Sequence, residues 1–134
     1  MDNIYEIILS NMLPADILKD FLPVSITEKQ YGVELRMEER ETNLPIELTG
    51  VEDVVKDGYC NAIELLHFHM KGKPLYLQLY RRRWKQSGSN RHYSNSYNLH
   101  PEGVKATHEF AAFLKESGGI TTDEYIHYLI GTES

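Results

Sequence analysis

The sequence predicts an α+β domain, in which an antiparallel sheet of four to five strands is flanked by short N-terminal helices and by two C-terminal helices. Three observations support this prediction. Apolar residues recur with helical spacing in residues 1–22, alternate with a period of two in segments of residues 23–99, and return to helical spacing in residues 103–134. A chain of 134 residues has the size of one domain, so we expect 1–134 to fold as a single unit.

The first 22 residues predict a small helical hairpin. Apolar positions in NIYEIILSNM (3–12) have the spacing of a short amphipathic helix. Pro14 suits the first turn of a second helix, because the N–H that proline lacks would be unpaired there in any case. We expect that second helix to end near Phe21 and Leu22.

The central segment begins with a predicted β-hairpin. VSITEKQ and VELRMEER both alternate apolar and polar residues, and Tyr31-Gly32 between them suits a turn near residues 30–32. Residues 40–60 are acidic and rich in turn-forming residues. We therefore expect a loop there, with a short helical turn near residues 51–55.

Two further strands are predicted over residues 61–70 and over PLYLQLYRRRW, which runs from Pro74 to Trp84. A flexible QSGSN loop (86–90) follows. The polar residues 91–99 are the candidate for a fifth strand. The fourth strand, the loop and the fifth strand would then form a basic strand–loop–strand unit.

The last third of the chain predicts two helices. Thr107 suits a helix N-cap, because HEFAAFLKES after it has a helical apolar stripe, and Gly118-Gly119 would end that helix. Thr121 followed by Glu124 has the spacing of a capping box at the start of the last helix.

The charge of the chain is unevenly distributed. The net charge is −6, yet no Asp or Glu lies between Leu65 and Pro101. Asymmetry of this kind favours an anionic partner for one region of the protein. The alternative is a solvated basic face that acidic neighbours balance within the fold. The seven cations of this window are Lys71, Lys73, Arg81, Arg82, Arg83, Lys85 and Arg91.

The arginine run follows directly on an apolar strand. Alternate leucines from Leu75 to Leu79 share one face, and Arg81 and Arg83 continue that face. Because an unpaired arginine cannot stay buried, the strand must leave the core by about Arg81. Beyond that point we expect the arginines and Lys85 to be exposed, together with Trp84.

An exposed basic strand with aromatic residues is suited to nucleic acid. Guanidinium groups match phosphate oxygens, and aromatic faces stack on bases or sugars. A β-ribbon of this kind can follow a phosphate backbone or enter a groove. On the residues alone, an equally good interpretation makes Trp84 a core anchor and pairs the arginines with the acidic loop at 38–57. The predicted DNA-binding residues are Lys71, Lys73, Arg81, Arg82, Arg83, Trp84, Lys85, Arg91, Tyr93 and Tyr97.

Three segments resemble a known family. GKPLYLQLYRRRW (72–84), YNL (97–99) and THEFAAFLKE (107–116) are similar to the N-terminal region of bacterial insertion-sequence transposases of the ISAon-type group. In that family a strand runs into R-R-R-[WF], and a later helix begins T-x-E-F-A-x-F-L-K. The chain matches every specified position of the helix motif, whereas Tyr97 stands where the family often has Trp.

The resemblance implies a non-catalytic domain that binds the DNA ends of its own mobile element. Larger transposases carry a zinc ribbon at the corresponding place, but this chain has no cysteine after Cys60, so we expect neither a metal nor another cofactor. We find no catalytic motif and no room for a catalytic domain. DNA cleavage would then need a second polypeptide, or a continuation of the same frame, and homodimer formation is left open.

Two alternatives belong to other functional classes. The acidic N-terminal half is suited to a protein–protein interaction module that docks a catalytic subunit. His67 and His69, two residues apart on a predicted strand, would suit a metal-dependent enzyme if His92, His100 or Cys60 supplied a third ligand. Steep salt dependence would distinguish phosphate binding from the interaction module, and metal analysis of the purified protein would test the metal-dependent enzyme.

The sequence also predicts the cellular location of the protein. A single cysteine cannot form an internal disulfide, which fits a reducing compartment. The N-terminal MDNIYEIILSNM lacks the basic and apolar regions of a signal peptide, and no stretch approaches the length of a membrane span. We therefore expect a cytoplasmic protein that does not enter a membrane.

Overall fold

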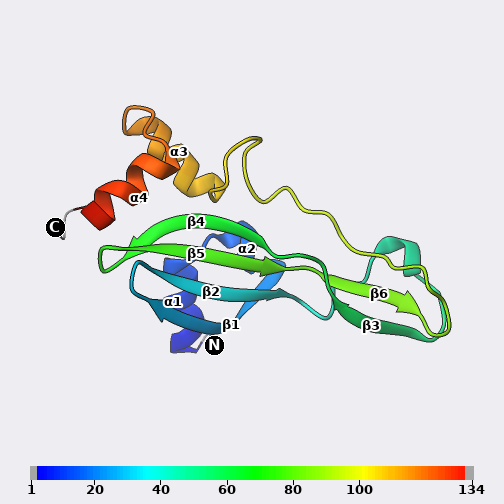
Figure 1. The fold of residues 1–134 in the computed structure, drawn as a ribbon. Coiled ribbons are helices and arrows are strands. Elements are labelled where there is room, and N and C mark those ends of the chain that lie inside the picture. Colours follow the sequence, from blue (N-terminus) through cyan, green and yellow to red (C-terminus); the bar gives the residue numbers. More distant parts are fainter. Residues whose placement is uncertain (1–2, 132–134) are drawn as a thin grey trace.

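The computed structural model describes residues 3–131 and has an α+β fold with a four-stranded mixed sheet, a separate two-stranded sheet and helices at both ends (Figure 1). The predicted α+β class, the short N-terminal helices and the two C-terminal helices are confirmed. In chain order the elements are α1 (Ile4–Met12), α2 (Ala15–Leu18), β1 (Phe21–Lys29), β2 (Gly32–Glu39), η1 (Ile46–Leu48), β3 (Val54–Tyr59), β4 (Ile63–Met70), β5 (Lys73–Tyr80), β6 (Arg82–Gln86), α3 (His108–Glu116) and α4 (Thr122–Gly131).

The four-stranded sheet has the order β1-β2-β5-β4. The hairpin predicted at residues 30–32 joins β1 to β2, and a second tight turn joins β4 to β5. Both hairpins are antiparallel, but β2 and β5 pair in parallel, from Val33 opposite Leu75 to Glu38 opposite Tyr80. The sheet is therefore mixed rather than wholly antiparallel, because each hairpin contributes its second strand to the centre of the sheet and both second strands run the same way.

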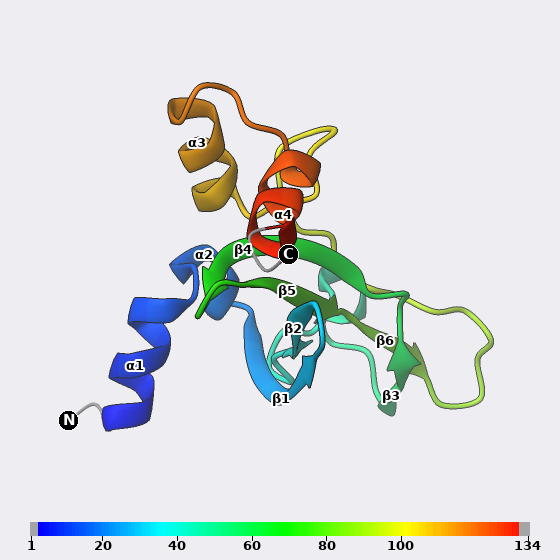
Figure 2. The same cartoon turned by 60° about the vertical axis from the view of Figure 1, so that its left-hand side comes forward.

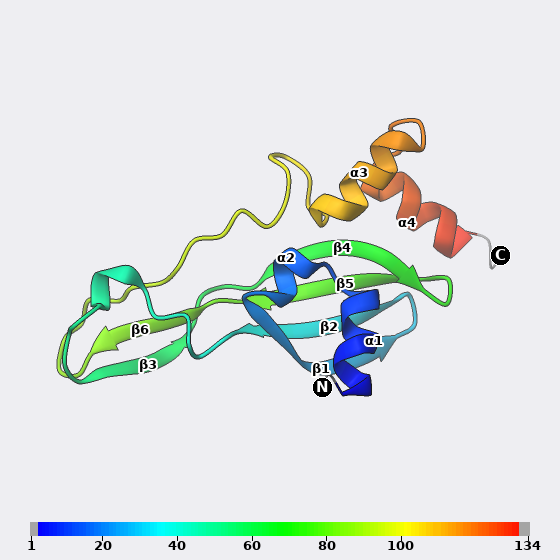
Figure 3. The same ribbon diagram turned by 180° about the vertical axis from the view of Figure 1, so that it is seen from behind.

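A two-stranded ribbon made of β3 and β6 continues beyond the end of the main sheet, as Figures 1 and 3 show from opposite sides. The predicted fourth strand is thus two strands, which Arg81 separates, and it leaves the core where the sequence indicated. The loop predicted over residues 40–60 instead contains β3, which pairs with β6 across an irregularity between Lys56 and Tyr59. Residues 91–99 do not form a strand, and only Tyr93 bridges to Trp84.

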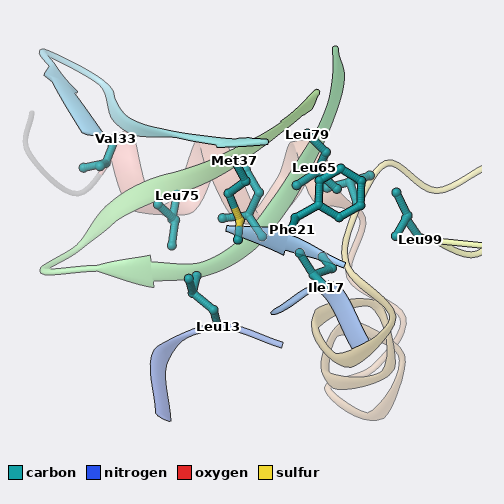
Figure 4. Close-up of a cluster of buried hydrophobic side chains, with 10 residues drawn as sticks. Leu13, Ile17, Phe21, Val33, Met37, Leu65, Leu75, Leu79 and Leu99 are labelled. Carbon is teal, nitrogen blue, oxygen red and sulfur yellow. The ribbon is translucent and has the colours of Figure 1, made fainter. Parts of the chain in front are cut away.

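Two apolar clusters lie on opposite faces of the main sheet. The larger one packs Leu65 of β4 and the leucines of β5 against Leu13, Ile17, Phe21 and Leu99 (Figure 4). Phe21 is fully buried and begins β1, so the second helix ends at Leu18 rather than near Phe21 and Leu22. The smaller cluster packs α3 and α4 on the other face and contains Leu66, Ala106, Phe110 and Leu114.

The helix starts follow the predicted caps. The Thr107 hydroxyl accepts a hydrogen bond from the Phe110 N–H at 3.2 Å and begins α3. The Thr121 hydroxyl accepts one from the Glu124 N–H at 3.1 Å and begins α4. No helix in the described part of the chain combines the length and the apolar character of a membrane span.

Candidate nucleic-acid interface

Arg82 is enclosed by partners within the fold. Its Nε donates to the main-chain carbonyl of Glu39 at 2.7 Å, and its Nη1 donates to the Tyr59 hydroxyl at 3.1 Å. Its Nη2 lies 3.7 Å from the Glu38 carboxylate, and only 12% of the side chain is exposed. The expectation that Arg82 would be exposed is therefore wrong, because the end of β2 supplies anionic and carbonyl partners for it.

Glu39 is the centre of this polar cluster. It is fully buried, and its carboxylate accepts hydrogen bonds from the Arg82 N–H at 2.8 Å, from the Asn95 side chain at 2.9 Å and from the Tyr97 hydroxyl. A buried carboxylate is tolerated where several donors satisfy it. Burial and the bond to Glu39 together raise the pKa of the Tyr97 phenol. Tyr97 is thus half-buried, and its ring packs edge-on against Phe21 of the core.

Arg81 and Trp84 also face partners within the fold. The Arg81 Nη1 donates to the Asn95 carbonyl at 3.1 Å, and the side chain is half-buried. Trp84 is only 8% exposed, so the expectation that it would lie among exposed residues is wrong. Its main chain exchanges two hydrogen bonds with the main chain of Tyr93, at 2.8 and 2.9 Å. This antiparallel bridge places residues 92–94 alongside β6. These contacts fasten residues 93–95 alongside Arg81 and β6.

Arg83, Lys85 and His92 gather on the ribbon around one carboxylate, that of Asp57. The His92 Nε2 bonds to the Asp57 carboxylate, and the Arg83 Nη2 lies 3.9 Å from it. The bond from His92, followed by the charges of Lys85, His92 and Arg83, lowers the pKa of Asp57. The Arg83 side chain is 44% exposed and Lys85 is half-buried, so this basic face is open to solvent.

Arg91 lies in the segment that runs beside the ribbon, whereas two of the predicted cations lie elsewhere. The Arg91 guanidinium is exposed and sits 5.1 Å from the centre of the Tyr93 ring. Lys71 and Lys73 belong to the turn between β4 and β5, at the far end of β5. A strand of that length spans roughly 25 Å. The structure therefore places Arg83 and Lys85 on β6 and Arg91 in the segment that bridges to it at Tyr93, and it leaves Lys71 and Lys73 apart from them.

The two histidines of β4 have structural partners. The His67 Nδ1 lies 2.8 Å from the Thr107 hydroxyl, inside the protein, and burial lowers the pKa of the ring. The His69 Nδ1 accepts a hydrogen bond from the Gly72 N–H at 3.2 Å. Among residues 3–131, no group of three or more His, Cys, Asp or Glu side chains is arranged to hold a metal ion.

The alternative interpretation of the sequence, in which Trp84 is a core anchor and the arginines pair with the acidic segment 38–57, is confirmed for Trp84, Arg82 and Arg83. It did not select the individual partners, and Asp57 lies in a segment that was expected to be a loop rather than the strand β3. Pairing of β3 with β6 brings Asp57 beside Arg83 from 26 positions away. A single-sequence pattern carries no signal for such a contact, because β3 has neither regular alternation nor a long apolar run.

A second exposed feature lies at the N-terminus. Within the described chain, α1 buries none of its nine residues, although most of them are apolar. Figure 2 shows α1 projecting away from the sheet, and its partly buried Leu9 packs against the core. Val24 and Ile26 on the edge strand β1 are exposed as well. The exposed apolar side chains of α1 are Ile4, Tyr5, Ile7, Ile8 and Met12.

Comparison of the chain with models of protein families, with curated proteins and with solved structures gives no match.

Proposed function

We propose that the chain is a non-catalytic DNA-binding module of a bacterial transposase, which acts in the cytoplasm with a catalytic polypeptide. The observation that carries the proposal is the β3–β6 ribbon, which extends from the body of the protein and keeps Arg83 and Lys85 accessible, with the exposed Arg91 in the segment beside it. The similarity of residues 72–84 and 107–116 to transposase N-terminal regions supports the same function.

The ribbon supplies both the charge and the shape for contact with a phosphate backbone. Arginine and lysine side chains make most contacts with DNA phosphates, and a two-stranded ribbon fits a major groove. Arg91 over the Tyr93 ring adds a flat cationic surface. Arg81 and Arg82 have a different part in this proposal, since their partners lie within the protein and fix the ribbon in place.

The acidic net charge of the chain does not oppose this interaction at close range. Charges separated by more than about 10 Å are largely screened at 0.1 M salt. The acidic residues of α1 and α4 lie on helices at the main sheet, whereas the ribbon extends beyond its end (Figure 1). The ribbon strands themselves carry four cations, Lys56, Arg82, Arg83 and Lys85, against one anion, Asp57, a formal charge of +3. Glu38, Glu39 and Glu41 contact Arg82 and Lys56, so Arg83 and Lys85 are the ribbon cations that can reach a phosphate.

Fluorescence anisotropy of a labelled duplex that carries the element's end tests the proposal. We expect wild-type protein to bind with an affinity that falls steeply as salt rises. A Lys85→Ala/Arg91→Ala variant should bind more weakly, and the slope of log K against log salt should decrease by about 1.8, the value for two lost phosphate contacts.

The matched control is Lys19→Ala/Lys29→Ala, which removes the same charge from exposed sites in the N-terminal part of the fold. This control should keep the wild-type slope. The proposal fails if wild-type protein shows no salt-dependent binding to the duplex, or if the control loses as much affinity as the ribbon variant while both proteins stay folded.

A second candidate function is docking to a separate catalytic transposase subunit through α1 and β1. The observation that favours it is the apolar surface of α1, since soluble proteins rarely expose a continuous apolar patch without a partner. An amphipathic helix that presents residues three and four positions apart is a common recognition element for a hydrophobic groove. This docking is compatible with DNA binding, because the ribbon lies at the other end of the sheet.

Co-expression with the catalytic polypeptide of the same element tests this second function. Wild-type protein should form a complex that is stable in size-exclusion chromatography, and an Ile4→Ser/Ile8→Ser variant should lose it. Leu44→Ser/Ile46→Ser is the matched control, because these apolar residues are also exposed, 41% and 83% against 66% and 45% for Ile4 and Ile8, but lie outside α1. A complex that survives the α1 substitutions would contradict docking at this surface, and self-association of the chain alone would identify a second copy as the occupant.

A further inference from the structure

Asp57 is surrounded by cationic groups that come from two other segments of the ribbon. His92 binds its carboxylate directly, Arg83 approaches it to 3.9 Å, and the charge of Lys85 acts on it as well. One carboxylate therefore faces two permanent cations and an imidazole. The local excess of positive charge leaves room for a second anion, or for a different anion in place of the carboxylate.

Arg83 does not depend on the Asp57 carboxylate for its position. Its Nε donates to the main-chain carbonyl of Asp57 at 3.1 Å, so the guanidinium stays on β3 even if the carboxylate moves away. Gly58 beside it has a φ of 77° and carries no side chain in front of the Arg83 Nη2. The main chain of β3 thus holds the Arg83 guanidinium in place, and its Nη1 and Nη2 groups can donate to another partner.

The cluster is open enough for a ligand to enter. The Asp57 and His92 side chains are 41% and 35% exposed. An ion pair at such exposure contributes little to stability, so a competing anion can displace it at little cost. A phosphodiester has one negative charge and two free oxygens, as a carboxylate does, and it fits the same donors.

We infer that Arg83, Lys85 and His92 form a contact site for a DNA phosphate, and that the Asp57 carboxylate occupies this site in the free protein. The inference rests on the proposed function and deepens it, because it assigns the phosphate position on the ribbon. Asp57 acts as an internal competitor that DNA must displace. Removing its charge should therefore strengthen DNA binding rather than weaken it.

Asp57→Asn is the variant that tests this inference, because asparagine keeps the shape of the side chain and removes the charge. In the duplex titration we expect it to bind about two- to fivefold more tightly than wild type, the factor that corresponds to an exposed ion pair. Asp53→Asn is the matched control: it removes the same charge at the start of the same ribbon, from an exposed residue whose φ of 56° suits asparagine. The control should bind like wild type.

The outcomes separate this inference from the proposed function. Equal gains in both variants would reveal a general charge effect and overturn the inference. Unchanged affinity of Asp57→Asn, with normal binding by wild type, would also overturn it and leave DNA binding intact. If neither wild type nor the variants bind the duplex, the proposed function fails. An NMR titration with inorganic pyrophosphate then tests whether the cluster binds an anion at all. Shifts of the His92 ring signals that are larger in Asp57→Asn than in wild type would support an anion site there, and their absence would overturn it.

Discussion

Arg82 and Glu39 are joined by two hydrogen bonds that run in the same direction. The Arg82 N–H donates to the Glu39 carboxylate at 2.8 Å, and the Arg82 Nε donates to the Glu39 carbonyl at 2.7 Å. This pair connects the start of β6 to the end of β2, at the junction between ribbon and sheet. It explains why an arginine-rich run follows an apolar strand: the first arginines build the junction, and the cations beyond it face solvent.

Replacement of Arg82 by alanine should destabilise the fold. The substitution removes the bonds to the Glu39 carbonyl and the Tyr59 hydroxyl and leaves Glu38 with one cation fewer. Loss of hydrogen bonds to a charged group costs about 1.5–3 kcal/mol. Urea unfolding followed by circular dichroism measures this change. An unfolding midpoint equal to that of wild type would show that Arg82 has no structural part in the junction.

Tyr97→Phe should lower stability without removing a surface contact. The hydroxyl donates to the buried Glu39 carboxylate, which keeps only its bonds from Asn95 and the Arg82 main chain in the variant. Removal of one hydrogen bond from a buried charged acceptor lowers the free energy of unfolding by about 1–3 kcal/mol. Chemical unfolding gives the magnitude, and DNA affinity measured on the folded variant should equal that of wild type. Weaker DNA binding at unchanged stability would instead place Tyr97 at the interface.

The buried His67 ring should make the stability of the protein depend on pH, with a loss of stability in mild acid. Burial lowers its pKa, so the folded state holds a proton less readily than the unfolded state. Unfolding then takes up a proton, and the free energy of unfolding falls as the pH drops below the unfolded value of about 6.5. Glu38 and Asp57, whose pKa values are lowered, make the protein less stable only as the pH falls through the more acidic range in which carboxylates titrate.

The His67→Gln variant isolates this effect. Its free energy of unfolding should change less between pH 7.5 and pH 5.5 than that of wild type, since the titrating ring is absent. Urea unfolding at the two pH values measures the difference. An identical loss of stability in both proteins would show that another group causes the pH dependence.

Elements that depend on local sequence could be predicted. The hairpin at Tyr31-Gly32, the strand before Arg81 and the Thr107 cap each follow from side chains a few residues apart, and the structure confirms them. The exit of the strand near Arg81 followed from one physical rule, that an unpaired arginine does not stay buried.

Contacts between distant segments could not be predicted in the same way. The parallel pairing of β2 with β5 depends on how two hairpins meet, which no periodicity encodes. The partners of Arg82 and Arg83 come from residues 43 and 26 positions away. A single sequence shows that an arginine needs an anion or a carbonyl, but it does not select one, and so two interpretations of the arginine run stood side by side.

The most direct test of the account compares two neighbouring arginines in the duplex titration. Arg82→Gln and Arg83→Gln each remove one charge and keep much of the side chain, but Arg82 binds within the protein and Arg83 faces solvent. We predict that Arg83→Gln lowers the slope of log K against log salt by about 0.9, the value for one phosphate contact, and that folded Arg82→Gln keeps the wild-type slope. A lower slope for Arg82→Gln with an unchanged slope for Arg83→Gln would contradict the account.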